Sequence, residues 1–249
     1  ALFCVNAGFW EGNVEFVLVR AKRGRVMALN TVSIVFDGPA GVGKSTIAKA
    51  IARKLGFAYI DTGAMYRAVT LFALEQGIPI GAKCQDALLD LVQGEEFQFV
   101  FTGDKLLIYF GQRDITTAVR SLEVTQHVSQ VATLPAVREG LRDIQRWMAA
   151  NIAVVMEGRD IGTVVLPNAT YKFFLTASVE VRAQRRFLEL SGQRVAADFE
   201  NICKSIQDRD FLDSSRTHSP LRMAADAIEI DTSSLSIQEV IETILSYIK

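Results

Sequence analysis

The residues with the clearest chemical potential form a glycine-rich segment, Gly38-Pro39-Ala40-Gly41-Val42-Gly43-Lys44-Ser45. The segment matches the phosphate-binding pattern GxxxxGK[ST], and it lies between an apolar β-branched stretch and a stretch with helical spacing. Glycines let consecutive backbone N–H groups turn toward phosphate oxygens, and the N-terminus of the following helix adds its positive dipole end. Lys44 can then bridge the outer phosphates, while the Ser45 hydroxyl can ligate Mg²⁺. The segment therefore predicts a site for a magnesium nucleotide.

Arginines beside Asp and Gly recur in three later segments, each in a context typical of a loop. They are Asp61-Thr62-Gly63-Ala64-Met65-Tyr66-Arg67, Glu157-Gly158-Arg159-Asp160-Ile161-Gly162-Thr163, and Arg209-Asp210 with Asp213 and Arg216. A single arginine is more often a solvated surface charge, so the inference depends on the whole set. Several arginines at one site suit two phosphate-bearing substrates.

Three further arginines, Arg182, Arg185 and Arg186, fall within one expected helix. Residues three or four apart project from one face of a helix. Two interpretations stay open, because these side chains can either close over ATP phosphates or solvate the helix.

A phosphate-binding loop alone does not identify the group that receives the phosphate. A regulatory GTPase would carry NKxD and DxxG motifs, and neither occurs in this sequence. Two other classes remain as alternatives. A P-loop kinase for shikimate or another nucleotide is disfavoured by the segment 209–216 and by a β-rich insert described below. A nucleotide-binding regulator without catalysis is disfavoured because the chemical groups are all present, namely Lys44, Ser45, Arg67, Arg159 and Arg216.

The amino-acid composition limits the classes of protein to which the chain can belong. A chain of 249 residues with 49% apolar composition suits one main domain, and 27 basic against 28 acidic residues give no global field for a nucleic-acid polymer or an anionic membrane. The three cysteines and two histidines show no metal-ligand spacing. No apolar run is long enough to cross a bilayer and no basic leader is present, so we expect a cytoplasmic protein.

The elements that must position these residues follow an α/β pattern. We expect strands over 32–36, 57–60, 153–156, 171–175 and 227–230, and helices over 46–55, 64–75, 135–150, 179–190, 197–214 and 237–248. The last helix begins with the capping box Ser236-Ile237-Gln238-Glu239. The segment 157–160 follows a buried strand, which is where open α/β sheets place a ligand crevice.

The segment 81–120 has a different character. A short helix over 86–92 precedes three expected antiparallel strands, 97–101, 105–110 and 115–119, separated by turn residues. We interpret this segment as a small β-rich insert on the substrate side. Residues 1–26 also stand apart, since no turn chemistry ties them to the strand that follows, and Met27 lies just before that strand. We expect a non-native or disordered extension there.

Four motifs resemble those of the bacterial-type cytidylate kinases, and the resemblance runs from about Val32 to the C-terminus. They are Gly38–Thr46, Asp61–Arg67, Gly158–Thr163 and the segment Arg209-Asp210-Phe211-Leu212-Asp213-Ser214-Ser215-Arg216. The resemblance implies a P-loop nucleoside-monophosphate kinase fold. This is a three-layer α/β fold with a five-stranded parallel sheet, a closing lid and a small antiparallel β insert over the monophosphate site.

The resemblance also implies roles for individual residues. The CMP phosphate would be bound by Arg67, Arg159 and Arg216, and the cytosine ring by Ser129, Arg138 and Asp160. The ribose would be bound by Arg209 and Asp213. Thr62 and Tyr66 would complete the acceptor site. The segment from Gly38 to Thr46 would hold ATP, with at least one of Arg182, Arg185 and Arg186 acting from the lid. Lys44, Arg159 and Arg216 would be the catalytic residues, and Ser45 would be the metal ligand.

The reaction that this resemblance implies is ATP + (d)CMP = ADP + (d)CDP, with Mg²⁺ as cofactor. We expect a monomer with a single kinase domain over 27–249. Its core would comprise 27–80 and 121–249, its insert about 81–120 and its lid about 182–197. Residues 1–26 match nothing in the family.

Overall fold

The computed structural model describes residues 8–10, 13–19, 31–94, 97–102, 105–192 and 198–248. These residues form two compact units. We call the described part of Ile34–Ile51 and Glu157–Lys249 the P-loop unit, because it contains the glycine-rich segment. We call the described part of Ala1–Ser33 and Ala52–Met156 the helical unit.

The predicted α/β fold and five-stranded sheet are present, and the strands lie in the order β10-β9-β3-β8-β4. Its strands are β3 (Ser33–Asp37), β4 (Ala58–Asp61), β8 (Val154–Glu157), β9 (Tyr171–Thr176) and β10 (Ile228–Asp231). Within the P-loop unit, β9 pairs in parallel with both β10 and β3. Phe36 lies opposite Phe173, and their rings stack with centroids 5.3 Å apart. Strands β3, β4 and β8 are buried along their whole length, as expected for strands covered on both faces, whereas in β10 only Ile230 is buried.

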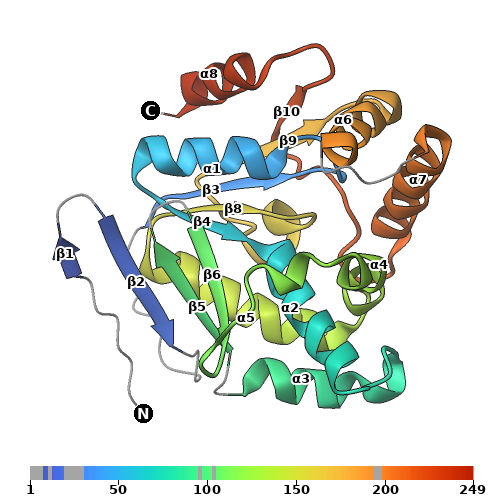
Figure 1. The fold of residues 1–249 in the computed structure, drawn as a ribbon. Coiled ribbons are helices and arrows are strands. Elements are labelled where there is room, and N and C mark those ends of the chain that lie inside the picture. Colours follow the sequence, from blue (N-terminus) through green and yellow to red (C-terminus); the bar gives the residue numbers. More distant parts are fainter. Residues whose placement is uncertain are drawn as a thin grey trace. The chain divides into compact units, whose positions relative to one another are not determined.

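The P-loop unit also contains residues 44–51 of helix α1 (Lys44–Leu55), helices α6 (Val179–Gly192), α7 (Phe199–Ser215) and α8 (Ile237–Tyr247), and the short π-helix η3 (Ile161–Val165). Helices α6 and α7 lie side by side (Figure 1), with Phe187 and Phe199 in edge-to-face contact. Helix α8 begins with the predicted capping box, in which Ser236 and Glu239 each accept a hydrogen bond from the other's backbone N–H.

Helix α2 (Thr62–Glu75) is the central element of the helical unit. It contacts α3 (Gln85–Gln93), α4 (Leu122–Val131) and α5 (Pro135–Asn151), and its inward face is apolar. Helix α5 begins with a proline, whose missing N–H costs nothing in the first turn. The 3₁₀ turns η1 (Ala82–Cys84) and η2 (Ala118–Arg120) complete this part.

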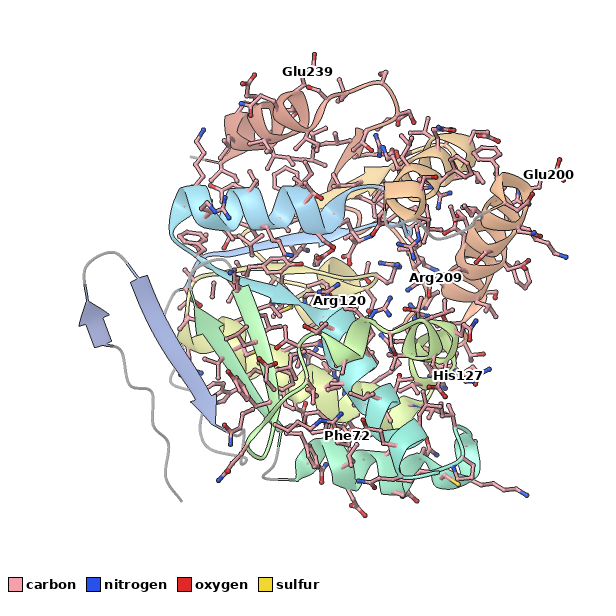
Figure 2. All side chains as sticks on the ribbon, in the orientation of Figure 1. Phe72, Arg120, His127, Glu200, Arg209 and Glu239 are labelled. Atoms are coloured by element: carbon pink, nitrogen blue, oxygen red, sulfur yellow. The ribbon has the colours of Figure 1, made fainter. Side chains whose placement is uncertain are left out.

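The predicted insert forms an antiparallel sheet within the helical unit. Strands β5 (Phe97–Thr102), β6 (Lys105–Phe110) and β7 (Arg113–Asp114) are joined at the β5 edge by β2 (Asn13–Val19), which pairs with β1 (Gly8–Trp10). Phe72 of α2, labelled in Figure 2, packs against Phe97 and Phe110 with ring centroids 5.4 and 3.9 Å away. An aromatic cluster therefore joins the insert to α2.

Two predicted features of the chain's organisation are only partly within the described residues. Residues 1–7, 11–12 and 20–26 of the predicted extension, and residues 193–197 of the predicted lid, lie outside them. The division into extension, core, insert and lid stays a prediction.

One predicted strand is wrong. Residues 115–119 do not form a strand, because the N–H of Val119 donates to the carbonyl of Ile115 in a helical turn that leads into η2. This turn places both side chains on the same side, where they are fully buried. Helix α4 was not predicted, although its N-cap Ser121 and the buried residues Val124, Val128 and Val131 have helical spacing. The other predicted strands and helices are present, with small shifts at their ends.

Within the described part of the chain, no helix combines the length and the apolar character needed to cross a membrane.

Candidate active site

The glycine-rich segment makes a tight turn between β3 and α1. Gly38 and Gly41 adopt φ values of 142° and 81°, which residues with a side chain rarely adopt. A Cβ at Gly38 would lie 2.1 Å from the carbonyl oxygen of Leu175, and one at Gly41 would lie 3.2 Å from Cβ of Arg182. Glycine is required at Gly38 because the turn presses against the neighbouring strand.

Lys44 is the first residue of α1 and is 5% exposed. Its ammonium group donates hydrogen bonds to the carbonyls of Gly38 and Pro39, at 2.8 and 2.6 Å. Burial holds the pKa of Lys44 well below its usual range, and the Arg159 guanidinium lowers it further, against the opposing influence of Glu157 and Asp37. The Lys44 side chain therefore folds back onto the glycine-rich turn, where it is predicted to bind phosphates.

The start of α1 is suited to an anion. Ser45 and Thr46 are exposed, and no acidic residue lies in the first turn of the helix. The free N–H groups and the positive dipole end at such a position attract phosphate. The predicted position of the phosphates and of the Ser45 ligand is thus accessible.

Arg159, Arg209 and Arg216 gather around one buried carboxylate, that of Asp213. The Nε of Arg159 donates to Oδ2 of Asp213 at 2.9 Å, and Nη1 of Arg216 lies 3.6 Å from Oδ1. Burial raises the pKa of Asp213, but Arg159, Arg209 and Arg216 together lower it below its usual value. Arg209, labelled in Figure 2, comes from α7 one turn before Asp213. Three guanidinium groups around one carboxylate leave a local excess of positive charge.

Asp160 follows Arg159 and is the N-cap residue of η3, with 5% of its surface exposed. The first two N–H groups of η3, those of Ile161 and Gly162, donate to the carboxylate of Asp37 at 2.9 and 2.7 Å. Burial raises the pKa of Asp37 to about 6, although both of these hydrogen bonds lower it. A carboxylate at the end of β3 thus anchors the segment that carries Arg159 and Asp160.

The three arginines of α6 have different surroundings. Arg182 is 4% exposed and donates to the carbonyls of Ala40 and Ala177, while its Nη1 lies 2.7 Å from Oδ2 of Asp210. Arg185 donates to both the hydroxyl and the carbonyl of Thr232.

Arg186 instead forms an exposed ion pair with Glu189. Arg182 therefore supports the glycine-rich turn directly in this structure, and Arg185 supports it through Thr232, whose hydroxyl donates to the carbonyl of Val42 at 3.2 Å. Of the three, Arg186 has the side chain with the most freedom to move.

The helical unit holds the other predicted residues, starting at the N-terminus of α2. Asp61 caps this helix by accepting the N–H of Ala64 at 3.0 Å, and its other oxygen lies 2.8 Å from Nη2 of Arg120. Thr62 is buried in the first turn. Arg67 donates to the hydroxyl of Thr125 on α4 at 2.7 Å. The Asp61–Arg67 motif is therefore one helix start, held in place by its own aspartate.

Arg138 and Tyr66 lie together in the same unit. Arg138 is 7% exposed, its Nη1 donates to the carbonyl of Ala132 at 3.0 Å, and its guanidinium lies 5.5 Å from the centroid of the Tyr66 ring. Ser129 is half-buried on α4. A guanidinium held over an aromatic ring in this way has a fixed orientation.

Sequence reasoning missed several residues that position the site. The sequence patterns predict no role in the site for five such residues, which are Asp37, Glu157, Asp210, Thr232 and Arg120. For Asp37 and Glu157 a signal was available, because each acidic residue ends a buried apolar strand, next to Gly38 and Gly158. The contacts of Asp210 and Thr232 depend on tertiary packing, so no local sequence pattern indicates them.

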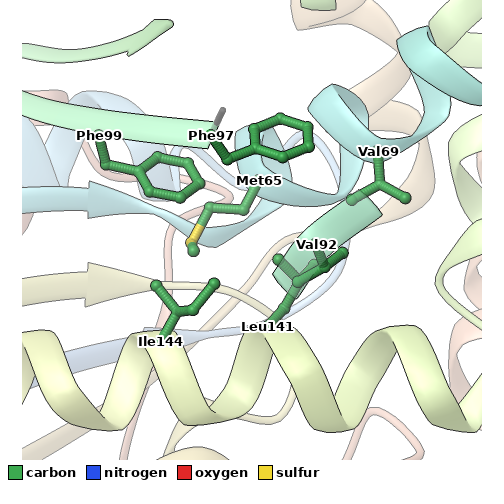
Figure 3. A pocket seen from close by; sticks show the side chains of 7 residues that line it. All are labelled: Met65, Val69, Val92, Phe97, Phe99, Leu141 and Ile144. Atoms are coloured by element: carbon green, nitrogen blue, oxygen red, sulfur yellow. The ribbon is translucent and has the colours of Figure 1, made fainter. Parts of the chain in front are cut away.

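A small apolar pocket in the helical unit is lined by Met65, Val69, Val92, Phe97, Phe99, Leu141 and Ile144 (Figure 3). It has no polar lining and no room for a water-sized molecule. It is part of the core between α2, α3, α5 and β5, and it is not a candidate for a nucleotide.

The chain matches the family described as cytidylate kinase over residues 34–249. It is 50% identical over 215 residues to a cytidylate kinase from Listeria monocytogenes serotype 4b (strain CLIP80459), which covers 86% of this chain and 95% of that protein. It is 49% identical over 218 residues to a cytidylate kinase from Streptococcus pneumoniae (strain 70585), covering 87% of this chain and 96% of that protein. Among solved structures, it is similar to a shikimate kinase from Bacteroides thetaiotaomicron, with 14% identity, a TM-score of 0.44, and 86% and 97% of the two chains covered.

Proposed function

Because the chain belongs to the cytidylate kinase family, we propose that it transfers the terminal phosphoryl group of ATP to CMP and dCMP. The observation that carries this proposal is the convergence of positive charge on Lys44. Beyond the effect of burial, both Arg159 and Arg209 lower the pKa of Lys44, against the opposing influence of Glu157 and Asp37. Arg159 is fixed in the same unit by a hydrogen bond of 2.9 Å to Asp213, so three cationic side chains share one region of the P-loop unit. Such an arrangement suits a site where the phosphates of two substrates meet.

ATP is the phosphoryl donor in this account. Its β- and γ-phosphates lie in the turn Gly38–Ser45 and at the N-terminus of α1, where the backbone N–H groups and the exposed Thr46 are available. Lys44 leaves the carbonyls of Gly38 and Pro39 and turns to the phosphates. The two hydrogen bonds from Lys44 to the carbonyls of the turn are thereby replaced by stronger hydrogen bonds to the phosphate anion.

Arg159 and Arg216 bind the CMP phosphate in this account, and Arg67 is a further ligand of that phosphate. Asp213 holds the guanidinium of Arg159 in place before CMP arrives, because their ion pair is nearly buried and hydrogen-bonded. Arg209 and Asp213 bind the ribose. Thr62 and Tyr66 complete the set of residues assigned to the acceptor.

Cytosine presents an amino donor next to acceptor atoms, so its recognition requires both a carboxylate and a donor. Asp160 supplies the carboxylate in this account, and Arg138 and Ser129 supply the donors. The fixed position of Arg138 over Tyr66 supports such a role. A guanidinium in a fixed orientation selects a ligand by the positions of its acceptor atoms as well as by its charge.

Transfer between two phosphates requires positioning and charge neutralisation rather than a protein base, since the accepting phosphate is already an anion at neutral pH. Lys44 stabilises the charge that spreads over the transferring group, and Arg159 and Arg216 keep the acceptor in line. Arg186 is the lid residue with the freedom to reach ATP, while Arg182 and Arg185 hold the turn in shape. Closure of the lid excludes water and so prevents hydrolysis of ATP.

The residues present fit Mg²⁺. The exposed Ser45 hydroxyl at the start of α1 is a hard oxygen ligand, and no group of three or more His, Cys, Asp or Glu able to hold a metal occurs among the residues that the structure describes. Ser45 would hold the ion together with phosphate oxygens and water, which is the usual environment of Mg²⁺ in such sites. When bound, the ion supplies charge neutralisation on the phosphates.

We further propose a monomer that works in the cytoplasm, as the sequence predicts. Light scattering coupled to gel filtration tests the monomer. A mass of twice 27.5 kDa would contradict it.

The function is tested by coupled ADP release with Mg-ATP and each of CMP, dCMP, UMP, AMP and shikimate. We expect strong release with CMP and dCMP, and none from a Lys44→Ala control. Release with shikimate or AMP alone would assign the chain to another group of small-molecule kinases. Binding of ATP without release on any acceptor would favour a regulator without catalysis.

A further inference from the structure

A buried carboxylate caps the helix that follows the proposed cytosine-reading residue. Asp37 is the last residue of β3 and is 4% exposed. It accepts the N–H groups of Ile161 and Gly162, more than 120 residues away in sequence, at 2.9 and 2.7 Å. These are the first two residues of η3, whose N–H groups have no acceptor within the helix. The cap therefore comes from β3, and Asp160, the residue before the helix, does not provide it.

We propose that Asp37 is a positioning residue for acceptor selection, which holds the start of η3 and thereby aims Asp160 and Arg159 at the acceptor. The inference rests on the proposed function, in which Asp160 reads cytosine and Arg159 holds the CMP phosphate. Asp37 itself touches neither group of CMP in this account.

The chemistry of the contact favours a carboxylate. The two N–H groups bond to different oxygens of Asp37, and an ionised aspartate supplies both. In asparagine one of the two positions is an NH₂ donor, which cannot accept a hydrogen bond. A negative charge at the start of a helix is also favourable because of the helix dipole.

The contact leaves little free space. A Cβ at Gly162 would lie 3.4 Å from Oδ2 of Asp37 and 3.3 Å from Cδ of Lys172. Lys172 is itself held by both carboxylate oxygens of Asp226, at 2.8 and 2.7 Å. Asp37 and Lys172 therefore both border Gly162, two residues after Asp160.

A second role for Asp37 would be to offset the charge of Lys44. The two residues interact electrostatically, and Asp37 favours the charged form of Lys44. The two roles differ in their consequences. A positioning role affects the choice of acceptor, whereas charge compensation affects the affinity for ATP.

The test compares Asp37→Asn with Gly162→Ala in the full chain. Gly162→Ala crowds the same contact from the helix side and keeps the Asp37 carboxylate beside Lys44. For each variant the measurements are kcat/KM for CMP and UMP, the KM for ATP, and the hydrogen-exchange rates of the Ile161 and Gly162 amides.

We expect Asp37→Asn to lower the ratio of kcat/KM for CMP over UMP by about tenfold, with a change in the KM for ATP below about threefold. Exchange of the two amides becomes faster. Gly162→Ala changes the ratio in the same direction. Adding Asp37→Asn to Asp160→Ala produces no further loss of selectivity, because Asp37 acts through the Asp160 segment.

An unchanged selectivity with a raised KM for ATP would overturn the proposal in favour of charge compensation. Should Asp37→Asn fail to fold, Gly162→Ala decides, and unchanged selectivity in that variant overturns the proposal. If the wild-type protein itself shows no preference for CMP over UMP, the proposed recognition of cytosine by Asp160 fails, and if it phosphorylates neither, the proposed function fails. The amide exchange rates still report whether Asp37 holds η3.

Discussion

Arg159 and Asp213 are joined by a hydrogen bond of 2.9 Å between Nε and Oδ2, although Arg159 follows β8 and Asp213 lies near the end of α7. The pair is nearly buried, with 19% and 8% of the two side chains exposed. Arg209 and Arg216 act on the same carboxylate. Asp213 is thus the anion that keeps three cationic side chains together before a substrate phosphate is present.

Removal of the Asp213 carboxylate leaves the nearly buried guanidinium of Arg159 without a negatively charged partner. We expect Asp213→Asn to lower the free energy of unfolding of the ligand-free protein by roughly 2 kcal/mol or more. Urea unfolding at neutral pH measures the change. Glu189→Gln is the matched control, because it removes the exposed partner of Arg186 and changes stability by less than about 0.5 kcal/mol. Equal stability of the two variants would show that Asp213 does not hold the cluster.

Arg182 and Arg186 lie one helical turn apart and should respond differently to truncation. Arg182→Ala removes a buried guanidinium that joins Ala40 to Asp210, so we expect a loss of about 3 kcal/mol in stability and a raised KM for ATP. Arg186→Ala changes stability by less than about 0.5 kcal/mol, because its pair with Glu189 is exposed. Its effect is on kcat, which falls about tenfold if the side chain reaches ATP. An unchanged kcat in Arg186→Ala would remove this residue from the lid assignment.

Lys44→Ala is expected to lower kcat/KM by about a thousandfold, because it removes the charge that meets the transferring group. Lys49→Ala is the control, since Lys49 is exposed on the same helix. Steady-state rates and equilibrium ATP binding are measured together for both variants. Near-normal turnover in Lys44→Ala, with ATP binding intact, would contradict the role of Lys44.

The pH dependence of stability provides a separate test of the Asp37 environment. Burial raises the pKa of Asp37 to about 6, above its ordinary value of 3.8. Between these values the folded protein holds a proton that the unfolded chain has released, so the folded state gains stability at low pH. This contribution is complete below the unfolded pKa and is lost as pH rises through the folded pKa.

From about pH 4.5 to about pH 7.5, we expect the wild-type protein to lose roughly 2 kcal/mol relative to Asp37→Asn, which has no group to titrate there. Urea unfolding over this range measures both slopes. Parallel curves would mean that Asp37 titrates normally.

The phosphate-binding turn and the arginine motifs could be predicted from sequence because their chemistry is local. Gly38 and Gly41 are needed for backbone conformations, and Lys44 follows at a fixed spacing. The motif Asp61–Arg67 is similarly local, since Asp61 caps the helix that carries Arg67.

Other features depend on packing that no local pattern records. Ile115 and Val119 are β-branched and suit a strand, but burial of both side chains on one side favours a turn. The spacing of Arg182 and Arg186 places both on one face of α6, yet only the tertiary structure buries one and exposes the other. The partners of Asp37 are distant in sequence for the same reason.

The most direct test of the central claim is a competition among acceptors. The purified protein is incubated with Mg-ATP and an equimolar mixture of CMP, dCMP, UMP, AMP and shikimate, and the phosphorylated products are identified by mass spectrometry. We predict that CDP and dCDP form first and account for nearly all of the ADP released. Formation of another product ahead of them, or of inorganic phosphate alone, would contradict the assignment of this chain as a kinase of cytidine monophosphates.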